Sequence, residues 1–132
     1  MKSPVPLPGC LLLLALLLAP LLAAPTRAAD DATTAAEIGY LLDFVATSGC
    51  TFIRNGSRND PEAAADHLRL KYSNGKRYVD SAEQFIDRLA SESSWSGKPY
   101  TVECQGTTEP SQAWLNRALA DYRQQPAEAE AD

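Results

Sequence analysis

Between positions 35 and 123, apolar residues recur at intervals of three and four, the spacing that places side chains on one face of a helix. Four stretches have this spacing, and their expected inward-facing residues are Ile38, Leu41, Leu42 and Val45; Ala64, Leu68 and Tyr72; Phe85, Ile86 and Leu89; and Trp114, Leu115, Ala118, Leu119 and Tyr122. The expected helix starts are Thr34, Asp60, Ser81 and Ser111. The pattern therefore predicts one small globular domain of four helices over residues 35–123.

Two short segments rich in β-forming residues interrupt the helical pattern, at 50–53 and 100–104. The second segment alternates in polarity, and Asn55-Gly56 after the first is a strong turn signal. We therefore expect a mainly α fold, with about four helices and two short β segments that can pair as a hairpin.

The first 28 residues have the pattern of a cleaved signal peptide. Lys2 precedes a leucine-rich run from Leu11 to Leu18, and small residues up to Ala28 complete a cleavage zone. The apolar run is shorter than the roughly 20 residues that span a membrane, and Pro20 interrupts it. The prediction is a periplasmic or secreted protein with no membrane span after cleavage.

Without this leader the chain is strongly acidic. Cleavage after Ala28 removes two basic residues and none of the 17 acidic ones, which leaves a formal charge of −7. Nucleic-acid binding requires clustered Lys and Arg, so it is not expected. Residues 29–34 are expected to form a flexible lead-in, and residues 124–132, rich in Ala, Glu and Pro, a disordered acidic tail.

Cys50 and Cys104 are the cysteines of the predicted mature chain. Thiols in an oxidising compartment pair where geometry allows, so a disulfide joining the two β segments is expected. Two cysteines and one distant histidine, His67, lack the ligand spacing of a metal site. We expect neither a metal nor another cofactor.

Polar residues gather in the loops beside the two β segments and on the second helix. The candidate binding residues are Arg54, Asn55, His67, Ser94, Ser96 and Tyr100. Loops on a rigid scaffold commonly carry function, and the planar fork of Arg54 suits a carboxylate or phosphate. Trp95, if exposed in its serine-rich loop, would be a further contact residue. These features favour a non-enzymatic binding module.

Two alternatives use the same residues. A small envelope hydrolase would use His67 as general base and Ser94 or Ser96 as nucleophile, oriented by Asp43 or Asp66, although no strand–elbow–helix motif surrounds either serine. In the other, the loop from Ser96 to Tyr100 resembles the Ser-Gly-x-x-Tyr loop that bacterial lysozyme inhibitors present to the enzyme's active-site cleft. Those inhibitors are mainly β proteins, whereas this pattern is mainly helical.

The sequence resembles the YfeK-like family of small exported bacterial proteins of unknown function. The resemblance covers about residues 37–123 and rests on the following segments: Cys50–Ser57, Ala65–Leu68, Lys71-Tyr72, Glu83–Ile86, Ser93–Cys104 and Trp114-Leu115. It implies a signal peptide, a Cys50–Cys104 pair and a location in the bacterial cell envelope. The expected partner is then an envelope protein or ligand, and the family supplies no established activity.

Overall fold

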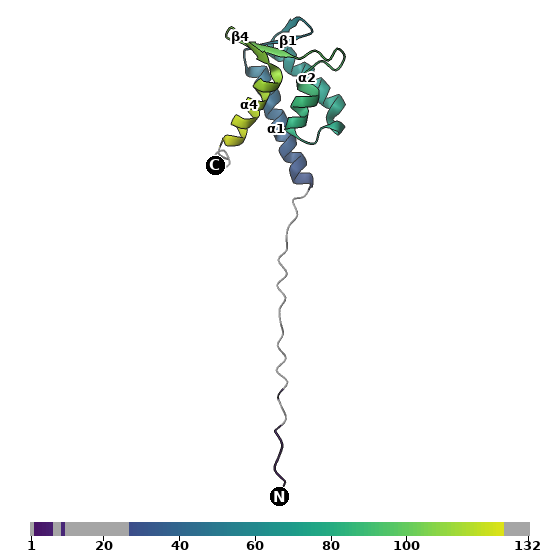
Figure 1. Ribbon diagram of the computed structural model, residues 1–132, viewed down its shortest axis with the longest axis vertical. Helices are drawn as coiled ribbons and strands as arrows, with labels where there is room; N and C mark the ends of the chain where they lie inside the picture. Colours follow the sequence, from purple (N-terminus) through teal and green to yellow (C-terminus); the bar gives the residue numbers. More distant parts are fainter. Residues whose placement is uncertain (1, 7–8, 10–26, 126–132) are drawn as a thin grey trace.

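The computed structural model describes residues 2–6, 9 and 27–125 (Figure 1). Its elements are, in order, α1 (Arg27–Thr47), β1 (Thr51–Arg54), β2 (Ser57–Asn59), α2 (Pro61–Gly75), the 3-10 turn η1 (Lys76–Tyr78), α3 (Ala82–Phe85), the π-helical turn η2 (Ile86–Ala90), β3 (Thr101–Cys104), β4 (Thr107–Pro110) and α4 (Ser111–Gln124).

The strands form one antiparallel sheet in the order β2-β1-β3-β4. The two predicted β segments are its central strands, which pair with Phe52 opposite Val102. The expectation of a mainly α fold with two β segments was wrong, because each central strand also pairs with a short outer strand. The outer strands were missed because they are short and polar, with no alternating apolar positions to predict a strand.

Each outer strand is joined to its central neighbour by a two-residue turn. The backbone φ is positive at both turn positions: 49° at Asn55, 78° at Gly56, 50° at Gln105 and 81° at Gly106. Two positive φ angles define a type I′ turn, whose twist matches that of paired strands. The turn expected at Asn55-Gly56 is therefore the tip of one hairpin, and Gln105-Gly106 forms the second.

The sheet lies at one end of the helices, and α1 runs between α2 and α4 toward it (Figure 1). Side chains from all four helices and both central strands meet in one apolar core. The predicted inward-facing residues are buried there, except that Tyr72, Leu89 and Tyr122 are partly exposed. Helical spacing therefore identified the core correctly.

Two helices begin as predicted. The backbone N–H of Ala63 donates to the Asp60 carboxylate over 2.8 Å at the start of α2, and Pro61 occupies the first turn. The N–H of Gln84 donates to the Ser81 hydroxyl over 3.1 Å at the start of α3.

The other two helices begin differently. α1 starts at Arg27, so residues 29–34 are helical where we expected a flexible lead-in, and Thr34 lies inside the helix rather than at its start. α4 does begin at Ser111, but the Ser111 hydroxyl donates to the carbonyl of Ala90 over 2.7 Å. That buried hydrogen bond ties α4 to η2 and does not cap the helix.

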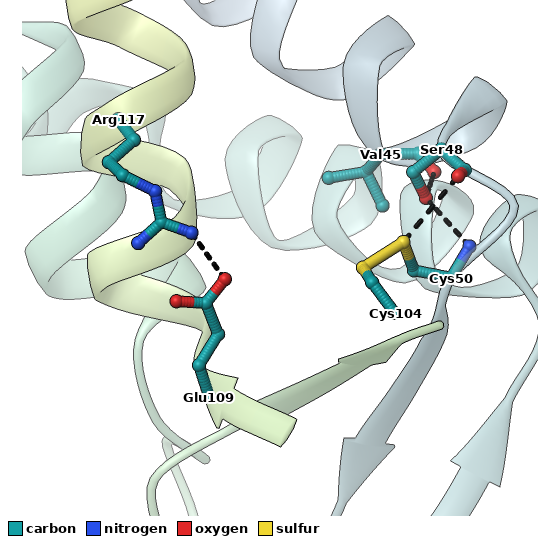
Figure 2. The surroundings of a disulfide bond; sticks show 6 residues. All are labelled: Val45, Ser48, Cys50, Cys104, Glu109 and Arg117. Atoms are coloured by element: carbon teal, nitrogen blue, oxygen red, sulfur yellow. Dashed lines mark hydrogen bonds and ion pairs between the residues drawn. A yellow bond between two sulfur atoms is a disulfide. The ribbon is translucent and has the colours of Figure 1, made fainter. Parts of the chain in front are cut away.

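Cys50 and Cys104 form the expected disulfide, which links the chain just before β1 to the end of β3 (Figure 2). Ser48 connects this point to α1: its hydroxyl donates to the Val45 carbonyl over 2.8 Å and accepts from the N–H of Cys50 over 3.2 Å. The disulfide therefore fixes one end of the central strand pair against the last turn of α1.

The predicted signal peptide and acidic tail fall largely outside the described residues, and both remain predictions. No helix in the described part of the chain combines the length and apolar character that a membrane span requires.

Candidate functional site

An open cleft of about 450 Å³ lies at the end of the central strand pair opposite the disulfide. Ile53 pairs with Thr101, so Arg54 and Tyr100, the next residues outward, lie at this end of the two strands. The cleft is lined by Arg54, Asn55, Ser57, His67, Lys71, Ser93, Ser94, Trp95 and Tyr100. The antiparallel pairing of β1 with β3 therefore brings both predicted polar loops to the end of the strand pair opposite the disulfide.

Helix α2 supplies one wall of the cleft through His67 and Lys71. They are four positions apart, so both side chains lie on the same helix face. The Arg54 guanidinium reaches this face from β1, and its Nη1 atom lies 2.9 Å from each ring nitrogen of His67. Because a guanidinium can only donate, it bonds to the ring nitrogen that lacks a proton. The contact therefore requires a neutral imidazole.

Tyr100 forms the floor of the cleft. Tyr100 is only 1% exposed. Its hydroxyl accepts a hydrogen bond from the Lys71 ammonium over 3.2 Å and lies 3.4 Å from Nε2 of His67. The Lys71 ammonium also donates to the Glu92 carbonyl over 3.1 Å and lies 5.0 Å from the centre of the Tyr100 ring. These contacts hold Lys71 across the cleft instead of in solvent.

Burial and mutual repulsion perturb the titratable groups of this site. Burial, reinforced by the charges of Arg54 and Lys71, lowers the pKa of His67 below its ordinary value. Burial and the Arg54 charge also lower the pKa of Lys71, with Glu92 opposing. Burial raises the pKa of Tyr100, with Arg54 opposing. At neutral pH the lowered pKa of His67 and the raised pKa of Tyr100 leave a neutral imidazole and a neutral phenol beside the Arg54 and Lys71 side chains.

Arg54 and Lys71 form no ion pair with any carboxylate in the described residues. Arg58 on the adjacent strand provides the contrast, because its guanidinium lies 3.1 Å from the Glu103 carboxylate. Arg69, on the same helix as His67, likewise pairs with Asp66 at 2.9 Å. The two cations of the cleft are thus available to an external anion.

The opposite wall is the loop from Ser93 to Lys98. Ser93 is 6% exposed, and its hydroxyl accepts hydrogen bonds from the Asn55 amide (3.2 Å) and from the N–H groups of Trp95 and Ser96 (3.3 Å each). The Ser96 hydroxyl donates to the Asn55 amide oxygen over 2.6 Å. Asn55 thus fastens the loop to the β1–β2 turn.

Five of the six predicted binding residues line the cleft: Arg54, Asn55, His67, Ser94 and Tyr100. Ser96, the sixth, is not among the lining residues, and its hydroxyl donates to the amide oxygen of Asn55. The candidate set omitted Lys71, Ser57, Ser93 and Trp95. Lys71 could have been included, because it shares a helix face with His67. Trp95 was expected to contact a ligand only on the condition that it is exposed. The sequence held no signal that Ser93, among its neighbouring serines, is the buried one.

The contacts of His67 differ from those that the hydrolase hypothesis expects. His67 contacts Arg54 and Tyr100, and no hydrogen bond joins it to a serine or a carboxylate among the described residues. Asp43 and Asp66, the expected orienting groups, pair with Arg69 instead. An imidazole with a lowered pKa beside two cations is also a weak base. In the same part of the chain, no cluster of three or more His, Cys, Asp or Glu residues could hold a metal ion.

In the loop from Ser96 to Tyr100, residues 96–99 are exposed, whereas the tyrosine is buried in the core. The Ser96 hydroxyl is bonded to the Asn55 amide oxygen. The lysozyme-inhibitor hypothesis, in which a serine hydroxyl or a lysine at the loop tip contacts the enzyme, stays a prediction.

Comparison with known proteins matches most of the chain to a family. The model of a family of unknown function, DUF5329, matches residues 32–123. The chain is also 46% identical over 81 residues to the uncharacterized protein YfeK of Salmonella typhimurium, an alignment that covers 61% of this chain and 68% of that protein. These matches confirm the resemblance noted in the sequence. No solved structure matches the chain.

Proposed function

This chain belongs to the family of unknown function DUF5329, and we propose that it is an exported, non-catalytic binding protein of the bacterial envelope whose cleft holds an anionic group of its ligand. One observation carries the proposal: Arg54 and Lys71 point into one cleft and neither has a carboxylate partner in the described residues. An anionic ligand would supply that partner.

The chemistry of the cleft suits a carboxylate or a phosphate. Arg54 offers a planar set of donors, Lys71 a second charge, and the Ser57 and Ser94 hydroxyls further hydrogen bonds. Hydrogen bonds to charged groups contribute about 1.5–3 kcal/mol each, roughly twice the value of neutral ones. Two such contacts are enough for selective binding of a small anion.

The acidic surface of the protein does not oppose this role at short range. The mature charge expected from the sequence is −7, but salt screens charges beyond about 8 Å at physiological ionic strength. A cation 4 Å from an anion contributes about 4 kcal/mol near a protein surface. The adjacent cations therefore outweigh the carboxylates beyond that distance, and Glu92, whose charge acts on Lys71, forms no ion pair with it.

Two features support an exported protein. The leader has the composition of a signal peptide, the domain contains a Cys50–Cys104 disulfide, and such bonds persist in oxidising compartments. The ligand would then be a component of the envelope or a molecule that passes through it.

The proposal is tested by titrating the purified mature protein with phosphate and with acetate, using NMR to follow the backbone amides of the cleft. Arg54→Ala is compared with Arg58→Ala, which removes the same charge from the neighbouring strand. We expect binding to weaken at least about tenfold in Arg54→Ala and to be nearly unchanged in Arg58→Ala. Equal affinities in the two variants would contradict the proposal.

A further inference from the structure

We propose that the anionic group is carried on a sugar ring, and that this ring stacks on Trp95. The inference rests on the proposed function, because Arg54 and Lys71 would hold the carboxylate or phosphate substituent of that sugar. Trp95 lies on the lining of the same cleft, so one ligand can contact the cations and the indole together.

The exposure of Trp95 is the first argument. Trp95 is 93% exposed, whereas Trp114 is 7% exposed and packs in the core. When a ligand covers a large apolar ring, binding becomes more favourable by about 25 cal/mol per Å² of apolar area removed from water. The location of this ring at the edge of a polar cleft favours a ligand with both an apolar face and polar edges.

The support beneath Trp95 is the second argument. The backbone N–H of Trp95 donates to the Ser93 hydroxyl. Two backbone hydrogen bonds close the same short loop: the N–H of Gly97 donates to the Ser93 carbonyl over 2.9 Å, and the N–H of Ser93 donates to the Lys98 carbonyl over 3.0 Å. The loop is also fastened to Asn55. The indole is therefore attached to an ordered backbone, which reduces the entropy that binding would cost.

The polar groups around the indole are the third argument. Ser57 and Ser94 line the cleft and are exposed, so their hydroxyls are accessible to a ligand. A serine hydroxyl both donates and accepts, which matches the hydroxyls along the edge of a sugar. The C–H groups on the face of a pyranose ring provide the apolar surface for the indole.

A sugar ring fits this cleft better than a nucleobase does. Pockets that bind a base hold it between two aromatic or apolar side chains, or stack it against one while hydrogen bonding its edge. Here Trp95 is the exposed aromatic side chain of the lining: the Tyr100 ring is buried and reaches the cleft through its hydroxyl, and the His67 ring is partly buried and bonded to Arg54. Serine hydroxyls, rather than a second exposed ring, complete the lining.

The experiment compares matched probes by NMR titration of the mature protein. Glucuronate is paired with acetate, glucose 6-phosphate is paired with inorganic phosphate, and glucose is the neutral control. We expect each acidic sugar to bind about tenfold tighter than its paired simple anion, and glucose to bind most weakly. The larger advantage identifies the substituent as carboxylate or phosphate.

Two variants assign the effect to the indole. Trp95→Ala should remove the tenfold advantage of each acidic sugar over its paired anion, and Trp95→Phe should keep most of that advantage. If the acidic sugars bind no tighter than their paired anions, the sugar is excluded while anion binding, and with it the proposed function, stands. If no anion binds, both fail. Adenosine monophosphate binding tighter than glucose 6-phosphate, with the difference lost in Trp95→Ala, would overturn the sugar in favour of a nucleotide.

Discussion

A single hydroxyl, that of Ser93, organises one wall of the cleft. It accepts from the Asn55 amide and from two backbone N–H groups of its own loop, those of Trp95 and Ser96. These three donors would otherwise need other partners. Ser93 therefore fixes the loop that carries Trp95, although it offers little surface to a ligand.

Replacing Ser93 with alanine should lower the free energy of unfolding by about 1–3 kcal/mol, because donors at a half-buried site lose their common acceptor. Ser94→Ala, at the exposed neighbouring position, should change it by less than about 0.5 kcal/mol. Urea unfolding followed by circular dichroism measures both variants. A Ser93→Ala protein as stable as Ser94→Ala would show that this hydrogen-bond cluster has no structural weight.

At the level of the elements, the central strand pair places the cleft. The disulfide closes one end of the β1–β3 pair, and the antiparallel register brings Arg54 and Tyr100 to the other end. The two type I′ turns then add the outer strands. The arrangement makes the disulfide a constraint on the scaffold, located away from the ligand site.

The buried parts of the fold were predictable from the sequence. The core faces of the helices and the two central strands follow from apolar spacing, which is strong wherever a side chain is buried. The outer strands face solvent and consist of residues such as Ser57 and Thr107, so they were expected as turns and loops. The site was predicted in part, because Arg54 is on β1 and His67 on α2, and only the packing of that helix against the strand shows that they meet.

Removing the disulfide should destabilise the domain markedly. The bond closes a sequence separation of 54 residues, for which loop-closure entropy gives about 4 kcal/mol, within the 2–5 kcal/mol typical of small exported domains. We expect this loss in a Cys50→Ala, Cys104→Ala double variant measured by urea unfolding. Thiol quantification on the purified mature wild type should find both cysteines oxidised. Two free thiols, with unchanged stability in the double variant, would refute the disulfide.

On the scale of the whole molecule, ion pairs join helices to one another and to the sheet. Arg123 of α4 joins α1 by two contacts with Glu37, at 2.7 and 2.9 Å, and also contacts Glu83 of α3. Arg117 pairs with Glu109 between α4 and β4 (Figure 2). These pairs tie the helices and the sheet together. Arg54 and Lys71 have no ion pair among the described residues and line the same cleft, which is where we propose that an anion binds.

The most direct test of that site is the pKa of His67, read by NMR from its ring protons with and without phosphate. Without an anion the pKa is lowered, by burial first and then by Arg54 and Lys71. An anion that neutralises these cations favours the protonated ring, so the pKa should rise, and phosphate should bind more tightly as pH falls through that pKa. The rise should be absent in Arg54→Ala and absent when chloride replaces phosphate at equal ionic strength. A His67 pKa that phosphate leaves unchanged, or shifts equally in Arg54→Ala, would contradict the account.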